Sequence, residues 1–208
     1  VFAGSLGLVW ILVLQQPELV YAVIDDEMLE TMEYMYEPGS SLREQRDASD
    51  DIMMFGHYIS NNIGIAFRTF ASGLFLGVGS MMIMLFNGTL FGAIAGHLMN
   101  IGSHEPFFTF VIAHGAPELT AIVLAGGAGL RLGMSLVAPG PYGRLEALKL
   151  AASDAMPVVY GCFFLLLGAA FIEAFWSPRL FAPEVKYAVG TVSWILVIGY
   201  LFLAGRRP

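Results

Sequence analysis

A histidine and a glutamate within one apolar stretch are the side chains whose types and spacing best suit chemistry. The stretch HGAPELTAIVLAGGAGLRLG begins at His114, and Glu118 follows four residues later. An imidazole and a carboxylate can transfer a proton, pair with a cation or ligate a metal ion. Both groups are costly in apolar surroundings unless they have polar partners. The sequence therefore requires partners for them elsewhere in the chain.

Other ionisable or amide side chains stand in separate apolar stretches. Together they define a predicted polar cluster: Arg68, Asn87, His97, His114, Glu118 and Glu173. We expect Arg68 to be the charge partner of Glu118 or Glu173. Three interpretations stay open. The cluster fixes the helix register, or it forms an outward-facing site for an ion, a lipid headgroup or a partner's side chain, or it is a metal site. The metal alternative uses His97, His114, Glu118 and Glu173.

No catalytic residue, metal or cofactor is assigned from the sequence. It contains no recognisable nucleophile–base arrangement and no phosphate-binding loop. The single cysteine, Cys162, cannot form an internal disulfide. No basic patch for nucleic acid is present, because the net charge is −7 and the basic residues are scattered.

The elements that must position these residues are membrane-spanning helices. The chain has 208 residues, of which 57% are hydrophobic and only 13% are charged. A helix needs about 20 mainly apolar residues to cross the hydrocarbon layer, and several stretches reach that length. Stretches rich in Leu, Phe, Gly and Ala favour helices over a barrel. We predict an all-α, polytopic membrane helical bundle that forms one domain over residues 1–208, with the lipid bilayer as its surroundings.

Six crossings can be drawn along the chain. They cover approximately residues 2–23, 63–86, 89–101, 107–132, 157–176 and 187–204. Asn87–Gly88 is a typical tight-turn dipeptide, which predicts a turn between the second and third crossings. The fourth crossing is predicted to be broken, because Gly115 can interrupt a helix and Pro117 suits the first turn of a new one.

Counting residues gives the expected depths of the polar groups. Glu118 lies about 20 Å from Arg131, and Arg68 about 28 Å from the predicted turn at Asn87, at ~1.5 Å per residue. His97 lies roughly 15 Å from the same turn. Glu173 stands three residues before Trp176, a residue type enriched at membrane interfaces. These counts predict that the ionisable groups meet in the outer half of the bundle.

An acidic, amphipathic segment is predicted outside the cytoplasm at residues 24–62. Residues 25–51 contain ten acids and two arginines, a net charge of −8. The spacing of Met28, Met32 and Met35 is typical of one helix face, although a solvated acidic loop is the alternative. Basic residues in short loops mark the cytoplasmic side, which places loop 134–149 and the C-terminus inside.

Glycines recur at intervals of four within the apolar stretches. They are Gly73 and Gly77, Gly88, Gly92 and Gly96, and Gly129 and Gly133. Small residues at this spacing let helix backbones approach closely in lipid. We predict that they pack helices within one subunit. The alternative is a subunit interface, and with it a homo-oligomer.

Four sequence blocks resemble the stage II sporulation protein M family. They are NNIGIAFRTFASGLFLGVGS, FNGTLFGAIAGH, AHGAPELTAIVLAGGAGLRLG and AAFIEAFWSP. The resemblance implies a polytopic inner-membrane protein. It also implies a scaffold role, because the sporulation namesake brings together two peptidoglycan-degrading proteins during engulfment of the forespore. The family pattern picks out residues to which it assigns no proven chemical role: Asn61, Asn62, Asn87, Gly88, His114, Gly115, Glu118 and Glu173.

The sequence therefore predicts a non-enzymatic inner-membrane scaffold that assembles envelope or peptidoglycan-remodelling proteins. The alternative is a permease-like protein that binds an ion or lipid in the polar cluster. A membrane-embedded hydrolase ranks third, because two acids and a histidine can perform general acid–base chemistry. The acidic stretch 25–51 is elaborated relative to the sporulation namesake, so the partners of this chain need not be the same.

Overall fold

The computed structural model describes residues 1–39 and 47–203, and every regular element within them is helical. This confirms the predicted all-α class. The elements are α1 (Phe2–Gln15), η1 (Pro17–Ala22), α2 (Asp26–Met35), α3 (Ala48–Tyr58), η3 (Ile59–Ile63), α4 (Gly64–Ala71), η4 (Ser72–Leu74), α5 (Val78–Asn100), α6 (His104–Val137), α7 (Arg144–Phe171), η5 (Ile172–Trp176) and α8 (Pro183–Leu203).

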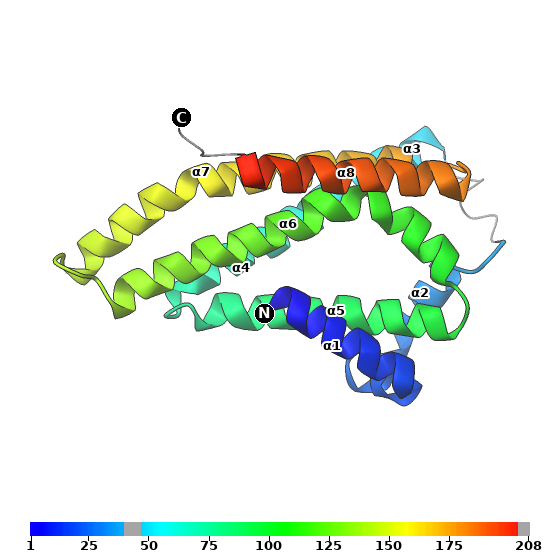
Figure 1. Cartoon of the computed structure of the whole chain (residues 1–208), viewed down its shortest axis with the longest axis horizontal. Coiled ribbons are helices and arrows are strands. Elements are labelled where there is room, and N and C mark those ends of the chain that lie inside the picture. Colours follow the sequence, from blue (N-terminus) through cyan, green and yellow to red (C-terminus); the bar gives the residue numbers. More distant parts are fainter. Residues whose placement is uncertain (40–46, 204–208) are drawn as a thin grey trace.

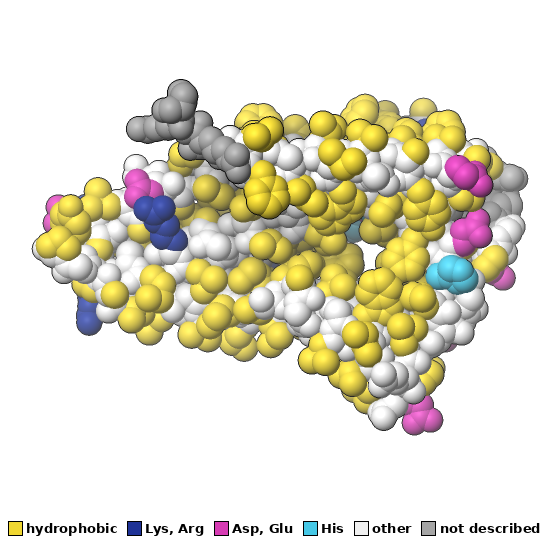
Figure 2. All heavy atoms as spheres, in the orientation of Figure 1, with side chains coloured by type: hydrophobic (Ala, Val, Ile, Leu, Met, Phe, Trp, Pro, Cys, Tyr) yellow, Lys and Arg dark blue, Asp and Glu magenta, His cyan; other side chains and the backbone are white. Residues whose placement is uncertain are grey.

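Four helical stretches are long and apolar enough to cross a membrane: Val78–Asn100, His104–Val137, Arg144–Trp176 and Pro183–Leu203. The protein is therefore a multi-pass membrane protein. The predicted crossings at residues 2–23 and 63–86 do not each form one long helix. The first contains α1, which has 14 residues, and the second is divided among α4, η4 and the beginning of α5. On the face shown in Figure 2, hydrophobic side chains cover the middle and charged side chains gather at the ends.

The long helices lie side by side, with α6 between α5 on one side and α7 and α8 on the other (Figure 1). Small residues allow this close packing. A Cβ atom added at Gly73 would overlap the carbonyl oxygen of Gly129, and one at Gly133 would overlap the backbone nitrogen of Gly77. The glycines of α5 face the backbone of α1 in the same way. The predicted packing of glycine stripes within one subunit is confirmed.

The predicted turn at Asn87–Gly88 is wrong. The helix α5 runs without interruption from Val78 to Asn100, and the chain reverses instead at Leu76 and Gly77, whose φ angles are 54° and 83°. In lipid, backbone groups must be satisfied within the protein, which disfavours a turn inside an apolar stretch. The Asn87 side chain, a turn-former in water, instead donates to the carbonyl of Ile83 one turn earlier, at 2.8 Å.

The predicted break in the fourth crossing is also wrong. The helix α6 is continuous from His104 to Val137, with Pro117 in its interior. Figure 1 shows that it bends, with the shorter arm at its N-terminal end. An interior proline removes one hydrogen bond and bends a helix. Here Pro117 is buried among neighbouring helices, whose packing keeps the two arms in one element.

The predicted acidic amphipathic segment, residues 24–62, contains α2, the whole of α3 and most of η3; its residues 40–46 lie outside the described part. The carboxylate of Asp25 accepts the backbone N–H of Met28 at 2.8 Å and caps α2. The buried face of α2 is centred on Leu29, which is 3% exposed, whereas Met28 and Met35 are 39% and 42% exposed. The amphipathic helix is thus present, but its buried face is centred on Leu29 and not on the methionines.

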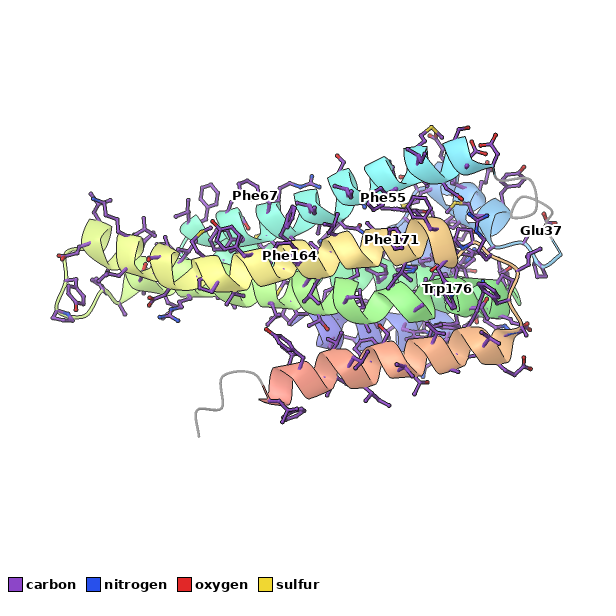
Figure 3. The ribbon with its side chains drawn as sticks, turned by 90° about the horizontal axis from the view of Figure 1, so that it is seen from above. Glu37, Phe55, Phe67, Phe164, Phe171 and Trp176 are labelled. Atoms are coloured by element: carbon purple, nitrogen blue, oxygen red, sulfur yellow. The ribbon has the colours of Figure 1, made fainter. Side chains whose placement is uncertain are left out.

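An aromatic seam fixes α3 against the end of α7. The ring of Phe55 lies 6.2 Å from that of Phe171 and 5.5 Å from that of Phe175. Figure 3 shows Phe55 and Phe171 close together on neighbouring elements, towards the end of the molecule where Trp176 lies. Aromatic pairs at such distances add to the stability that area burial provides. The seam holds η3 and η5 near each other, and both elements contribute to the site described next.

Candidate intramembrane polar site

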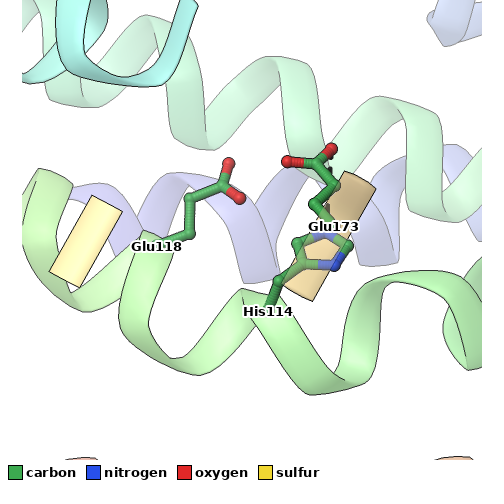
Figure 4. A group of neighbouring side chains, drawn as sticks. All are labelled: His114, Glu118 and Glu173. Carbon is green, nitrogen blue, oxygen red and sulfur yellow. Dashed lines mark ion pairs between the residues drawn. The ribbon is translucent and has the colours of Figure 1, made fainter. Parts of the chain in front are cut away.

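Three ionisable side chains converge inside the bundle: His114, Glu118 and Glu173. One ligand atom from each lies within 4.8 Å of the other two, and Figure 4 shows the three side chains pointing towards one another. His114 and Glu118 are 4% and 7% exposed, and the side chain of Glu173 is 12% exposed. The predicted convergence of these three residues is therefore present in the structure.

The continuity of α6 is what brings His114 and Glu118 together. Residues four apart on an α-helix lie on the same face, one turn above the other. A break at Gly115–Pro117 would have turned the two side chains away from each other. Glu173 comes from η5, a π-helical turn that extends α7. Such turns insert one residue into a helix, re-aim the side chains around it and occur frequently at functional sites.

Hydrogen bonds fix the orientation of the imidazole of His114. Its Nδ1 lies 3.0 Å from the hydroxyl oxygen of Ser177, and its Nε2 faces Oε1 of Glu173 at 3.9 Å. The backbone carbonyl of Ser177 accepts a hydrogen bond of 2.8 Å from Nζ of Lys186. The loop after η5 therefore holds one ring nitrogen, and the other ring nitrogen points to the carboxylates.

The two carboxylates have different surroundings. Nδ2 of Asn62 donates to Oε2 of Glu173 at 3.4 Å, and Nδ2 of Asn61 donates to Oδ1 of Asn62 at 3.1 Å. Both asparagines belong to η3, a second π-helical turn. By contrast, Oε2 of Glu118 is buried and has no hydrogen-bond partner among the described residues. A buried carboxylate oxygen without a donor is costly, so this atom marks a place where a ligand or proton fits.

The other three predicted cluster residues lie elsewhere. Arg68 is exposed near the end of α4, where its Nε donates to the carbonyl of Gly64 at 3.1 Å, and it pairs with neither Glu118 nor Glu173 within the described residues. Asn87 bonds within α5. Nε2 of His97 lies 2.7 Å from Oε1 of Glu33 on α2. Because the depths of Arg68 and His97 were counted from a turn at Asn87, the misplaced turn displaced them too.

Sequence reasoning missed several residues around the site. Asn62 appeared only in the family pattern, and Ser177 carries no local signal. Lys186 was not predicted to contribute, yet it is 3% exposed. Asp51 is one of the ten acids of residues 25–51, but it is 2% exposed and pairs with Arg179. The ion pair between Asp51 and Arg179 and the contact between Glu33 and His97 both join the acidic segment to the bundle.

The arrangement of Ser177, His114 and Glu173 follows the order of a nucleophile, a base and an acid. Two observations argue against that use. Ser177 is completely buried, at 0% exposure, and the distance of 3.9 Å between His114 and Glu173 exceeds a hydrogen bond. The group is better suited to holding a cation or sharing a proton, with Ser177 orienting the imidazole.

The fold and this site define a multi-pass helical membrane protein with a buried polar group between its central helices. The protein family described as Stage II sporulation protein M matches residues 1–178, so the chain belongs to this family. The match confirms the resemblance predicted from the sequence blocks and includes His114, Glu118 and Glu173. No curated protein and no solved structure matches the chain.

Proposed function

We propose that this protein is a non-enzymatic scaffold of the bacterial inner membrane, which assembles envelope or peptidoglycan-remodelling proteins. Family membership over residues 1–178 supports a role like that of the sporulation namesake. The observation that carries the proposal is the rigid attachment of the acidic helix α2 to the bundle. A scaffold needs a binding surface held against its membrane helices, and the contacts of α2 with the bundle support this role.

Three kinds of contact attach α2. Leu29 is buried in a cluster with Val13, Val20, Ile24 and Ala93. Glu33 pairs with His97 of α5 at 2.7 Å. The ring of Tyr36, just after α2, packs edge-on against Phe107 at 5.1 Å. Apolar, ionic and aromatic contacts therefore hold the same short helix.

Exposed carboxylates surround the rest of α2 and its two ends. This acidic surface consists of Asp25, Asp26, Glu27, Glu30, Glu33 and Glu37. A hollow of about 420 Å³ adjoins it, lined by Glu30, Glu33, Tyr34, Glu37, Pro38, Ile101 and Ser103. Charge of one sign steers an oppositely charged partner to its site. The partner chemistry that fits is a basic surface on an extracytoplasmic protein.

Partner capture tests the scaffold proposal. In membranes crosslinked in the native host, the full-length protein should capture envelope-remodelling proteins. The triple change Glu27→Gln, Glu30→Gln and Glu37→Gln should remove most of this capture; Glu33 is kept because it holds α2 to His97. Glu146→Gln, an exposed acid at the start of α7, is the matched control and should leave capture unchanged. Equal capture by the triple variant would refute the role of the acidic surface.

The proposed topology has six crossings, with α1 and the α3–η3–α4 run as the two shorter ones, and α2 outside the cytoplasm. In a Cys162→Ser background, an impermeant thiol reagent should label Thr31→Cys from outside and Ala138→Cys only after the membrane is opened. The physical reason is the positive-inside rule, because Arg131, Arg144 and Lys149 adjoin loop 138–143. Labelling of Ala138→Cys in intact cells would reverse the orientation.

A permease-like protein is the second candidate, and the buried group of His114, Glu118 and Glu173 favours it. The two functions differ in what they require of this group. A scaffold should retain its partners after neutral replacement of Glu118, provided that folding survives, whereas a permease should lose transport.

We also propose that copies of the chain associate in the membrane. Because the glycines of α5 and α6 pack within the chain, such association would use other surfaces.

A further inference from the structure

We propose that His114, Glu118 and Glu173 bind one divalent transition-metal ion, with Zn²⁺ as the best fit. The site would join α6 to η5 inside the membrane. This inference is independent of the scaffold proposal, since it concerns the interior of the bundle rather than the acidic surface. It rests on the donor set, on the groups that orient the donors and on the unsatisfied oxygen of Glu118.

The donor set suits a borderline transition metal. One imidazole nitrogen and two carboxylate oxygens are the ligand types that Zn²⁺ accepts at about 2.0–2.2 Å, with a fourth position open to water or a substrate. Ligand atoms around a tetrahedral Zn²⁺ ion are therefore roughly 3.4 Å apart. Nε2 of His114 and Oε1 of Glu173 are 3.9 Å apart, and all three ligand atoms lie within 4.8 Å of one another. We expect side-chain rotations to close that difference when an ion binds.

Each of two ligands has a partner that orients it as metal sites require. Metal-bound histidines usually donate their other N–H to an oxygen, which fixes the tautomer. Nδ1 of His114 lies 3.0 Å from the hydroxyl of Ser177, which leaves Nε2 for the ion. Asn62 holds Oε2 of Glu173 at 3.4 Å, so that Oε1 faces His114. These contacts position lone pairs at one point between α6 and η5.

The buried carboxylate of Glu118 is a second observation, separate from the donor set, that indicates a missing ligand. Its side chain is 7% exposed, and Oε2 is buried without a hydrogen-bond partner among the described residues. Ala121 and Ile122, one helical turn further along α6, are 0% and 1% exposed. A bound dication would satisfy this oxygen and compensate the two carboxylates.

Metal binding to the purified full chain tests the proposal. Protein in detergent is stripped with a chelator, loaded with ZnCl₂, desalted and analysed for metal by mass spectrometry. The wild type should retain about one Zn²⁺ ion per chain, as a single three-ligand site predicts. Glu118→Gln and His114→Gln should each lose it. Glu33→Gln, which removes the carboxylate paired with His97 outside the site, is the matched control and should retain Zn²⁺ like the wild type.

Two further measurements keep the test independent of folding defects. Ser177→Ala leaves all three ligands in place and should weaken Zn²⁺ binding roughly 10–100-fold, as loss of an orienting partner does at metal sites. Zn²⁺ should also raise the melting temperature of the wild type and not that of Glu118→Gln, because a ligand that binds only the folded state stabilises it. Mg²⁺ should bind at least about tenfold more weakly, since it prefers oxygen ligands and keeps its waters.

The proposal is overturned if the folded wild type retains no more Zn²⁺ than Glu118→Gln, or if Glu33→Gln loses as much metal as the site variants. Mg²⁺ binding as tight as that of Zn²⁺ would overturn the transition-metal assignment. A wild type without metal whose melting temperature rises after Glu118→Gln would also overturn it, because Glu118 would then be a buried carboxyl group that no ligand stabilises. None of these results bears on partner capture, so the two proposals fail separately.

Discussion

Gly129→Ala should destabilise the protein more than any other single methyl addition to α6 between residues 126 and 130. A Cβ atom at Gly129 would overlap the hydroxyl of Ser80 and lie 2.8 Å from the carbonyl oxygen of Phe70 and 2.9 Å from that of Thr69. Two of these neighbours are backbone atoms, which cannot rotate away. The hydroxyl of Ser80 is itself held by a 2.6 Å hydrogen bond to the carbonyl of Thr69. We expect a loss of about 3 kcal/mol, at the upper end for overpacking.

Gly127→Ala is the matched control, because it adds the same methyl group to the same helix two residues earlier. No atom lies within 4 Å of a Cβ atom at Gly127, which is exposed. Since alanine is a better helix former than glycine, this change should be neutral or stabilising by up to about 1 kcal/mol. Thermal melting in detergent, followed by circular dichroism, measures both. Equal melting temperatures for the two variants would show that α6 does not approach α4 and α5 so closely.

The glycine spacing is also the part of the fold that the sequence predicted best. Close approach in lipid requires small residues on one helix face, and a spacing of four identifies that face without any knowledge of the partner helix. The helical class follows as directly, because a lipid environment allows few other structures. The partners could not be predicted in this way. That Gly129 meets Gly73, and that α5 meets α1, depends on the whole packing arrangement.

Two local signals misled the division into helices for the same physical reason. Asn87–Gly88 and Gly115–Pro117 are turn or break signals in water, where exposed backbone groups bond to solvent. Inside an apolar bundle a break leaves several backbone groups without partners, whereas one interior proline leaves only one. Both helices therefore continue. Whether such a dipeptide ends a helix therefore depends on whether its backbone groups are exposed to water or buried in the bundle.

The candidate site was half predictable. His114 and Glu118 stand four apart, so a helix of any kind places them on one face. The level of Glu173 followed from its closeness to Trp176. The contributions of Asn62 and Ser177 were not predictable, because they depend on two π-helical turns and on the loop after η5. Arg68 was misplaced because its depth was counted from a turn that does not exist. A different acid, Asp51, has a cationic partner, and this partner lies in the loop after η5.

That partner is Arg179, and Arg179→Ala should destabilise the protein strongly. Its guanidinium pairs with Asp51, which is 2% exposed, and its Nε donates to the carbonyl of Phe175 at 3.0 Å. Removing one member of a buried pair costs about 3–5 kcal/mol, because the remaining charge stays buried. Since the side chain of Arg179 is 42% exposed, we expect about 3 kcal/mol, at the low end of that range.

The exposed pair of Arg131 and Asp154 provides the matched control. Its charged atoms are 2.5 Å apart, but the two side chains are 61% and 57% exposed. Exposed pairs contribute about 0–1 kcal/mol and are screened by salt. Arg131→Ala should therefore lower the melting temperature little, and less still at high salt. Because both changes remove an arginine from an ion pair, a difference between them does not come from the loss of a positive charge alone. It reports the burial of Asp51 together with the bond of Arg179 to the carbonyl of Phe175.

A double change separates the stranded charge from the lost contacts of the arginine. Asp51→Asn removes the buried negative charge and keeps the shape of the side chain. Arg179→Ala combined with Asp51→Asn should therefore be more stable than Arg179→Ala alone, because desolvation offsets most of the attraction within a buried pair. Thermal melting of the wild type, both single variants and the double variant gives the coupling energy. A double variant no more stable than Arg179→Ala would show that Arg179 acts through the carbonyl of Phe175 and its packing, and that the carboxylate of Asp51 is stabilised by other groups.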